Sequence, residues 1–337
     1  MSNKLQWGII GTGTIARKFA KGLLQSKSSE LAAIGSRTSH SVLAFAKDFP
    51  AACYSSYEAM LADSRVQAIY VSTPHPVHAE WAIRAAEAGK HVLCEKPLAM
   101  NYHEAQSIID AARRHGVFLM EGFMYRCHPQ TMRLAELIRK QVVGEVKLIR
   151  ATFSFCCPFD PLSRLFSAEL GGGGILDVGC YCVSMARLIA GAVTGKAFED
   201  PLEVKGTGHI GATGVDEYAV ASLKFPNAIV AQIAAGVQLD LENNVRIVGT
   251  EGSILVPDPW TMNSDGPGFS KILVFKSHIP EEIVIETDLG LYALEADHVA
   301  EQIAKGRTQS PLVSWDDSLG NMCALDQWRA QVDGMPY

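Results

Sequence analysis

The stretch Leu5–Ala16, LQWGIIGTGTIA, decides the fold, because it reads as a buried strand that runs into a glycine-rich turn and then a helix. Its spacing is G-x-G-x-x-A: Gly11 permits a tight turn, Gly13 lets the backbone approach a pyrophosphate, and Ala16 allows close helix packing. The amino terminus of such a helix offers free N–H groups to an anion. The stretch therefore predicts a dinucleotide site. The expected cofactor contacts within it are Gly11, Gly13, Thr14 and Ile15.

Strand-like and helix-like segments alternate after this stretch, up to residue 142. Such alternation is typical of βαβ units and predicts a doubly wound parallel sheet, an α/β Rossmann domain over residues 1–123. The expected strands are Leu5–Ile10, Leu31–Ser36, Ala68–Ser72, His91–Cys94 and Val117–Glu121. The expected helices lie near Thr14–Gln25, Ser39–Asp48, Tyr57–Ala62, Val77–Ala88, His103–His115 and Pro129–Gln141.

The pattern changes after Gly144, where runs of β-branched residues are joined by turns such as Pro226-Asn227. This predicts an α+β domain over residues 124–337 with an open, mostly antiparallel sheet, for substrate binding and oligomerisation. The expected strands are Val146–Phe155, Leu202–Ile210, Glu217–Phe225, Ile229–Leu239, Val245–Val248, Ile272–Phe275 and Glu282–Ile285. The expected helices are Ile175–Ala190, Leu291–Ala304 and Asp316–Val332, and the last two can pack back on the first domain.

Size and composition limit the class of protein. The chain has 337 residues, more than the roughly 150 of one ordinary domain, so two domains are expected. A net charge of −6 without a long basic run disfavours nucleic-acid binding. The sequence shows no charged leader and no apolar run near the ~20 residues of a membrane helix, so we expect a cytoplasmic protein without a membrane partner. The eight cysteines lack zinc-site spacing, so we expect no metal and mostly buried, reduced thiols.

The end of the second expected strand decides which nicotinamide cofactor is used. An acidic residue there would hold the ribose hydroxyls of NAD, but the sequence reads Ser36-Arg37-Thr38. A guanidinium can pair with a 2′-phosphate in a bidentate manner, and the two hydroxyls add neutral donors. We therefore predict NADP(H), held by all three residues. The alternative is that Arg37 is an ordinary solvated side chain.

Two further strand ends should face the same crevice, because ligands of doubly wound sheets bind outside the carboxyl ends of the strands. The first strand is followed by Thr73, Pro74 and His78, and the second delivers Glu95 and Lys96. We expect all five residues at the cofactor. Two alternatives stay open: His78 could merely cap its helix, and Lys96 could be a solvated surface charge.

These motifs, together with Glu121–Pro129 and Gly172–Tyr181, resemble the Gfo/Idh/MocA oxidoreductase family. The order G-x-G-x-x-A, T-P-x-x-x-H, E-K-P and G-G-G-x-x-x-D-x-G-x-[HY] extends over almost the whole chain. The resemblance implies a Rossmann domain, a C-terminal open antiparallel sheet, and hydride transfer between a nicotinamide and a carbon bearing a hydroxyl or carbonyl. Tyr181, where many members have His, is similar to the branch of dimeric dihydrodiol dehydrogenase, NADP-dependent D-xylose dehydrogenase and glucose–fructose oxidoreductase.

Oxidation of a carbinol needs a proton acceptor near its oxygen and a positive charge for the developing alkoxide. We predict that Tyr181 and Lys96 supply these, and that the ammonium lowers the pKa of the phenol. Asp177 precedes Tyr181 by one helical turn, so it should share its face and hold Lys96 or a substrate hydroxyl. Alternatively, Asp177 serves only the helix dipole.

Substrate contacts are expected from two segments around the cleft, besides Asp177. Arg126 and His128 follow the strand Val117–Glu121 and should reach the cleft floor, although Arg126 could equally pair with a structural carboxylate. Arg164 and Phe166 precede the glycine run and should form a lid or a substrate wall.

The features together predict an NADP-dependent oxidoreductase acting on a sugar, polyol or cyclic diol. Two alternatives are reduction of a keto-sugar such as an anhydrofructose, and an NADP-sensing regulatory protein without catalysis. We also expect a homodimer or homotetramer formed through the C-terminal sheet, because its apolar face should exceed what a monomer exposes. The residues expected on that face are Val220, Leu223, Ile229, Ala231 and Ile233.

Overall fold

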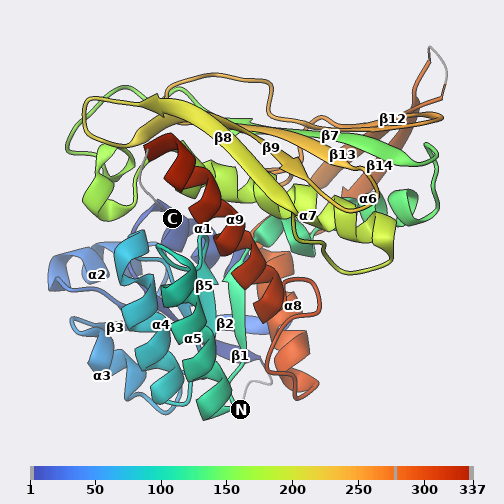
Figure 1. Cartoon of the computed structure of the whole chain (residues 1–337). Helices are drawn as coiled ribbons and strands as arrows, with labels where there is room; N and C mark the ends of the chain where they lie inside the picture. The colour runs from blue at the N-terminus through green and yellow to red at the C-terminus, as the bar shows by residue number, and fades with distance from the viewer. Residues whose placement is uncertain (1–3, 277–278, 334–337) are drawn as a thin grey trace.

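The computed structural model describes residues 4–276 and 279–333 and shows two sheets with helices beside and between them (Figure 1). The first sheet has six parallel strands in the order β3-β2-β1-β4-β5-β6. Its strands are β1 (Leu5–Ile10), β2 (Ser29–Gly35), β3 (Ala52–Tyr54), β4 (Ala68–Val71), β5 (His91–Glu95) and β6 (Leu119–Gly122). The strand order reverses between β1 and β4, so the ligand crevice of a doubly wound fold is expected outside their carboxyl ends.

Helices cover the first sheet and bury its central strands. The residues of β4 and β6 are all buried, as the uniformly apolar run from Ala68 to Val71 requires. The helices of this part are α1 (Thr14–Gln25), α2 (Ser39–Ala46), α3 (Tyr57–Leu61), the short η1 (His75–Val77), α4 (His78–Glu87) and α5 (Tyr102–His115). The left-handed residue Gly116 ends α5, because only a residue without a Cβ adopts φ 64° at little cost.

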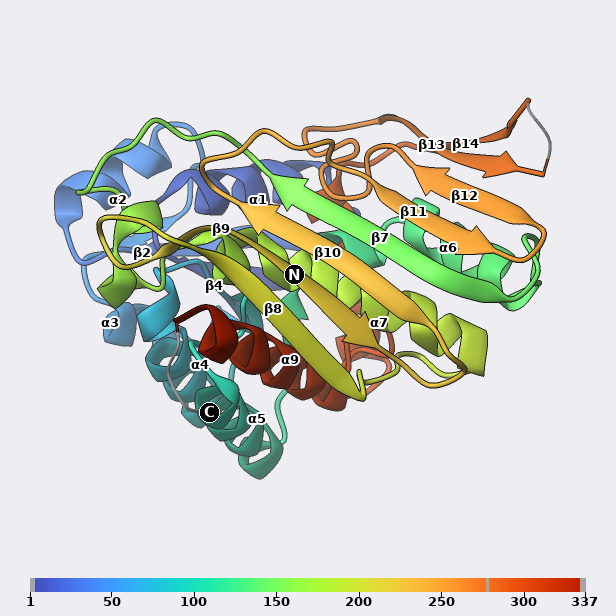
Figure 2. The ribbon, with the colours of Figure 1, turned by 45° about the horizontal axis from the view of Figure 1, so that its top comes forward.

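The second sheet has eight strands in the order β14-β13-β12-β11-β7-β10-β9-β8. Its strands are β7 (Val146–Ser154), β8 (Glu203–Ile210), β9 (Asp216–Lys224), β10 (Val230–Gly236), β11 (Val245–Gly249), β12 (Gly252–Val256), β13 (Gly268–Phe275) and β14 (Glu281–Thr287). All neighbours are antiparallel except β7 and β10, which are parallel. One face of this sheet packs on helices, and Figure 2 shows no helix over the other.

Four longer helices follow β6 in the described part of the chain: α6 (Pro129–Arg139), α7 (Cys180–Thr194), α8 (Leu291–Ala304) and α9 (Trp315–Asp333). Short helices precede α6 and α7, namely η2 (Met124–Cys127), η3 (Arg164–Phe166), η4 (Ala168–Leu170) and the π-helical η5 (Ile175–Gly179). Helix α7 lies under the second sheet (Figure 1). By length and composition the stretch Ala168–Thr194 could cross a membrane, but its apolar window is completely buried inside the protein. A core helix passes the same test, so this stretch is weak evidence for a membrane span.

The predicted fold class, a parallel Rossmann sheet followed by an open, mostly antiparallel sheet, is confirmed. Two short strands, β3 and β12, were not expected, because three to five residues carry little periodicity. The expectation of mostly buried thiols is wrong for Cys53 and Cys156, which are exposed.

The prediction that five apolar residues lie on the uncovered face of the second sheet is wrong for four of them. Leu223, Ile229, Ala231 and Ile233 are fully buried, and only Val220 is exposed. The reason is the period of two along a strand: β9 buries Ala219, Ala221 and Leu223 against the helices and turns the residues between them outward.

Candidate active site

The glycine-rich turn between β1 and α1 leaves an open cradle at the crevice. Gly11 has φ 106°, and a Cβ there would stand 3.0 Å from the carbonyl oxygen of Ser72, so the position requires glycine. A Cβ on Gly13 would meet nothing within 4 Å. Gly13 also begins α1 without a side-chain cap, and Thr14 is exposed. The first N–H groups of α1 therefore face free space, which is what a bound phosphate needs.

Ser36, Arg37 and Thr38 follow β2, directly beside this cradle. The amide of Gly11 donates to the carbonyl of Gly35, which ties the two strand ends together. Arg37 is exposed and makes no hydrogen bond or ion pair within the described part of the chain. Thr38 caps α2 by accepting from the amide of Ser41, so its hydroxyl is partly used inside the protein. The guanidinium is the free donor of the three.

Two residues after β4, Thr73 and His78, differ in whether their polar atoms have partners within the protein. The hydroxyl of Thr73 is buried and has no partner among the described residues. His78 is fully buried, and its ring nitrogens lie 2.9 Å from the carbonyl oxygens of Pro97 and Thr73. Burial lowers the pKa of His78 to about 4, so the ring is neutral and donates through one nitrogen. His78 thus fixes the loop after β5, and its contact with cofactor stays a prediction.

Lys96 follows β5 and points across to the second lobe. Its ammonium donates to the carbonyl oxygen of Asp177 at 2.7 Å and stands 3.9 Å from the carboxylate of the same residue. It also lies 5.1 Å from the centre of the Tyr181 ring, over its face. Behind it, Glu95 accepts from the Lys96 amide and from the hydroxyl of Tyr70. These contacts bring together the three residues that were predicted to be catalytic.

The glycines before Asp177 are required because other segments of the chain approach their backbone closely. A Cβ on Gly172 would stand 2.5 Å from the carbonyl oxygen of Leu165, and Gly173 has φ 102° against the side chain of Asp216. Asp216 in turn accepts from the amide of Ile175 at 2.6 Å and so caps the helix that follows. The second sheet thereby fixes where this helix begins.

Asp177 lies inside a π-helical turn, η5, that runs directly into α7. The expected α-helical stacking of Asp177 and Tyr181 therefore does not apply, because a π-turn rotates the following residues differently. Turns of this kind are rare and are frequently found at functional sites. Here the turn presents the Asp177 carbonyl and carboxylate to Lys96.

Arg164 completes the charge arrangement from the loop above the cleft. Its guanidinium donates to the Asp177 carboxylate at 2.9 Å and is 41% exposed. Burial would raise the pKa of Asp177, but Lys96, Arg164 and His75 together lower it. Asp177 is therefore an anion held between two cations, rather than a carboxylate that serves only the helix dipole.

The environment of Tyr181 differs from the prediction. Its hydroxyl donates to the sulfur of Met124 at 3.3 Å, a weak acceptor, and Phe123, Tyr125, Phe153 and Trp260 surround its ring. Burial and the nearby Glu95 raise the pKa of Tyr181 well above 10. The expected lowering by Lys96 is thus wrong, because the ammonium lies over the ring face and burial outweighs it.

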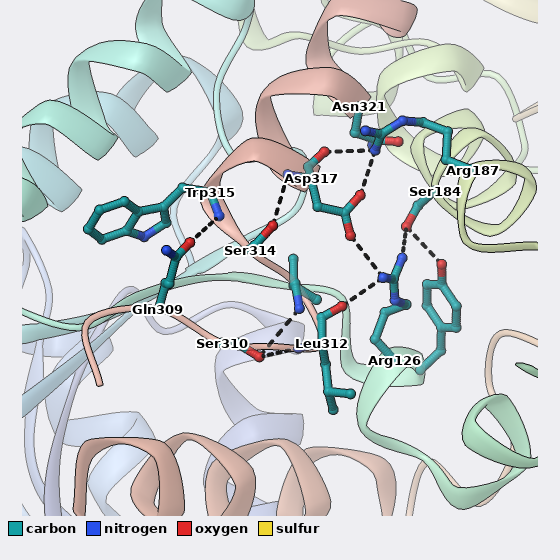
Figure 3. A network of polar contacts seen from close by, with 12 residues as sticks. Arg126, Ser184, Arg187, Gln309, Ser310, Leu312, Ser314, Trp315, Asp317 and Asn321 are labelled. Atoms are coloured by element: carbon teal, nitrogen blue, oxygen red, sulfur yellow. Dashed lines mark hydrogen bonds and ion pairs between the residues drawn. The ribbon is translucent and has the colours of Figure 1, made fainter. Parts of the chain in front are cut away.

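Arg126 does not face the cleft but is enclosed in a polar network (Figure 3). It donates to Asp317 at 2.8 Å, to the carbonyl of Leu312 at 2.7 Å and to the hydroxyl of Ser184 at 3.1 Å. Its side chain is 2% exposed. The structural-carboxylate alternative therefore describes this residue, and its donors are used within the protein.

Two other expected substrate residues are also buried. His128 accepts from the amide of Gln130 and caps α6, and burial lowers its pKa to about 4. Phe166 packs in a small apolar cluster with Val215 and Val237. Their roles toward substrate remain predictions, as does that of Asp177, which is also buried, whereas Arg164 is partly exposed.

His75 belongs to this site but was not among the expected residues. It is buried, and its Nδ1 lies 3.0 Å from the carbonyl oxygen of Gly171, so it joins the loop after β4 to the glycine run. Burial lowers its pKa to about 3. Its position directly after Pro74 at a strand end was the available signal.

Three local features at the carboxyl ends of the strands suit a dinucleotide. The uncapped start of α1 and the space at Gly13 suit a pyrophosphate, the free guanidinium of Arg37 suits a 2′-phosphate, and the unpartnered hydroxyl of Thr73 lies between them and Lys96 in chain order.

Comparison with known proteins agrees with this geometry. Residues 5–123 match the model of the oxidoreductase family with an NAD-binding Rossmann fold, and residues 131–255 match the Gfo/Idh/MocA C-terminal domain. The chain belongs to the Gfo/Idh/MocA oxidoreductase family, as the motifs indicated. The family expectation is confirmed.

Three relatives illustrate the neighbourhood of the chain. Trans-1,2-dihydrobenzene-1,2-diol dehydrogenase of Xenopus laevis is 34% identical, with 98% of each chain covered. D-xylose 1-dehydrogenase (NADP(+)) 2 of Haloferax volcanii is 32% identical, with 96% of this chain and 95% of the relative covered. The crystal structure of a 3-ketoreductase from Actinomadura kijaniata, in complex with NADP and TDP-benzene, superposes with a TM-score of 0.85 at 27% identity over 98% of each chain.

Proposed function

We propose that this protein is an NADP-dependent oxidoreductase that transfers a hydride between nicotinamide and a hydroxyl or carbonyl carbon of a sugar, polyol or cyclic diol. The observation that carries the proposal is the position of Lys96, whose ammonium is held between Asp177 and the ring of Tyr181 beside a dinucleotide crevice. The dihydrodiol and D-xylose dehydrogenases, which are similar to this chain over almost its whole length, are the analogues for this proposal.

NADP supplies the hydride acceptor when bound, with the 2′-phosphate at Arg37 and the pyrophosphate at Gly11–Thr14. Residues of the chain supply the positive charge and the proton for the reaction. Lys96 stabilises negative charge on the substrate oxygen, and Asp177 keeps the ammonium in place. Because the pKa of Tyr181 is raised, its hydroxyl stays protonated at neutral pH and can donate to an alkoxide. Arg164 offers further donors to substrate hydroxyls at the cleft mouth.

A second candidate is keto-sugar reduction, in which Tyr181 would give its proton to the substrate oxygen. The neutral phenol is the form that donates a proton to a reduced carbonyl, whereas oxidation of a hydroxyl needs a group that accepts the proton. A carbonyl substrate and NADPH would then give the faster reaction.

The test is a screen of the purified protein with NADP or NAD against aldoses, inositols and cyclic diols, and with NADPH against keto-sugars, following absorbance of the reduced cofactor. Turnover with a sugar or diol supports the first candidate, and turnover only with keto-sugars supports the second. Cofactor binding without turnover on any substrate would favour a sensing protein.

We further propose a homodimer or homotetramer formed through the uncovered face of the eight-stranded sheet, with a domain division at residues 123/124. Tyr218, Val220 and Val230 are exposed on that face. Val220→Lys should weaken association without affecting the buried core, which light scattering at micromolar concentration measures. A monomeric wild type would refute the proposal. The eight cysteines all lie in the described part of the chain and none forms a disulfide, which supports a reducing, cytoplasmic location.

A further inference from the structure

Helix α9 lies between the two lobes and packs against α5 on one side and β8 on the other (Figure 1). No expected active-site residue lies on it. Its side chains nevertheless bind backbone atoms of the segment that follows Lys96 and of the residue directly before Tyr181.

On the nucleotide side, α9 holds the loop that follows Lys96. Asp326 accepts from the amide of Tyr102 at 2.8 Å, and Arg329 donates to the carbonyl oxygen of Met100 at 2.9 Å. Met100 lies near the end of the loop that follows Lys96, and Tyr102 is the first residue of α5. The chain downstream of Lys96 is therefore fixed to α9 at two neighbouring points.

On the substrate side, α9 holds the π-helical turn that precedes Tyr181. The amide group of Asn321 donates to the carbonyl oxygen of Cys180 at 3.3 Å, and Asn321 is 1% exposed. Trp328, fully buried, lies on Gly179, where a Cβ would stand 2.9 Å from the indole ring. Asp317, one turn before Asn321, binds Arg187 of α7 at 2.6 Å (Figure 3).

Carbonyl groups at this π-turn accept from side chains outside the helix. A π-turn departs from the regular α-helical hydrogen-bond ladder, which leaves carbonyl groups beside it open to such partners. Asp177 obtains one from Lys96, and Cys180 obtains one from Asn321. Catalytic groups must be held within about 0.5 Å of their productive geometry.

We propose that α9 is a positioning element of the active site: Arg329 and Asp326 fix the loop after Lys96, Asn321 fixes the turn before Tyr181, and the helix thereby sets the geometry of the catalytic pair. The proposal rests on the proposed function, in which Lys96 and Tyr181 act on the substrate oxygen.

The test compares matched variants on the same helix. Arg329→Met and Asn321→Leu should each lower kcat at least about tenfold, because a displacement of ~1 Å can cost a hundredfold. NADP affinity, set at Gly13 and Arg37, should stay within about twofold, and Arg329→Lys, which keeps a donor, should restore most of kcat. Fluorescence titration and steady-state kinetics measure these quantities.

Gln331→Leu is the control. Gln331 is also an amide of α9 and binds the backbone of β8, at Gly206 and Val204, away from both catalytic residues. Its loss should leave kcat near the wild-type value. If it lowers kcat as much as Asn321→Leu, the effect is general to the helix and the proposal is overturned.

The remaining outcomes separate this proposal from the proposed function. Full turnover in Lys96→Met would refute the function itself. An inactive Lys96→Met together with unchanged kcat in Arg329→Met would refute only the role of α9. Arg329 is partly exposed, so this variant remains informative even if Asn321→Leu does not fold.

Discussion

Two cation–carboxylate pairs of this protein are built alike, and the first of them joins the two lobes. Lys96 follows β5 and meets Asp177 just before α7. Arg126 follows β6 and meets Asp317 in the first turn of α9. Each cation also donates to a backbone carbonyl, and a further arginine joins each carboxylate.

The two pairs differ in the distance between their charged atoms and in the exposure of their side chains. The ammonium of Lys96 stands 3.9 Å from the Asp177 carboxylate, and Arg164, the second cation, is 41% exposed. The Arg126–Asp317 distance is 2.8 Å, and Arg187, its second cation, is fully buried. A ligand can hydrogen-bond only to donors that no protein group already occupies. The partly exposed Lys96–Asp177 pair is therefore suited to the reaction, whereas the buried Arg126–Asp317 pair stabilises the fold.

The largest effect is expected when the Lys96–Asp177 pair is broken. Lys96→Met should lower turnover by about 10²–10⁴, because it removes the charge at the substrate oxygen, while the unfolding free energy falls by only about 1 kcal/mol. Tyr181→Phe should cost a similar factor. Since both act on one oxygen, the double variant should be little worse than either single one in steady-state kinetics. Near-full turnover in Tyr181→Phe would instead assign the proton to another group.

Breaking the closed pair should do the opposite. Arg126→Met leaves Asp317 buried with Arg187 alone, so we expect a loss of about 3 kcal/mol in the free energy of unfolding, the low end for breaking a buried pair. Urea denaturation measures this loss. At temperatures where the variant is folded, kcat should change less than tenfold, and the affinity for substrate should persist. A stable variant that no longer binds substrate would return Arg126 to the substrate site.

The pH dependence of stability sharpens the contrast. Lys96 and Arg164 help to lower the pKa of Asp177, whereas burial raises the pKa of Glu121, beside the closed network, to about 7. A carboxyl whose pKa is raised by folding stabilises the protein below pH 4.5 and loses this contribution as the pH rises through 7. Relative to Glu121→Gln, the wild type should therefore lose about 2–3 kcal/mol between pH 5 and pH 8. Parallel denaturation curves at the two pH values would contradict the raised pKa.

The smallest expected effect lies at the exposed end of the crevice. Arg37→Ala removes a free guanidinium, so NADP affinity should fall at least about tenfold, equivalent to roughly 1.5–3 kcal/mol. NAD affinity should hardly change, because NAD lacks the 2′-phosphate. Titration with both cofactors measures the ratio, and equal losses for both would make Arg37 a structural residue.

Much of the site was predictable because it lies at strand ends. Gly11, Gly13, Arg37 and Lys96 each follow a recognisable strand, and the carboxyl ends of parallel strands meet at one edge. The contact of Arg164 with Asp177, the bond of His75 to Gly171 and the role of α9 were not predictable, since they depend on which distant segments meet.

The sequence by itself determined the class of protein, through local signals: a period of two, glycine at positive φ, and charged residues at strand ends. It could not distinguish Lys96 from Arg126, because both are cations after a strand. Only the tertiary structure decided that Asp317, Ser184 and the carbonyl of Leu312 bind the guanidinium of Arg126, whereas the side chain of Lys96 stays 13% exposed. It likewise decided the raised pKa of Tyr181, because burial depends on the side chains that long-range packing assembles around the phenol.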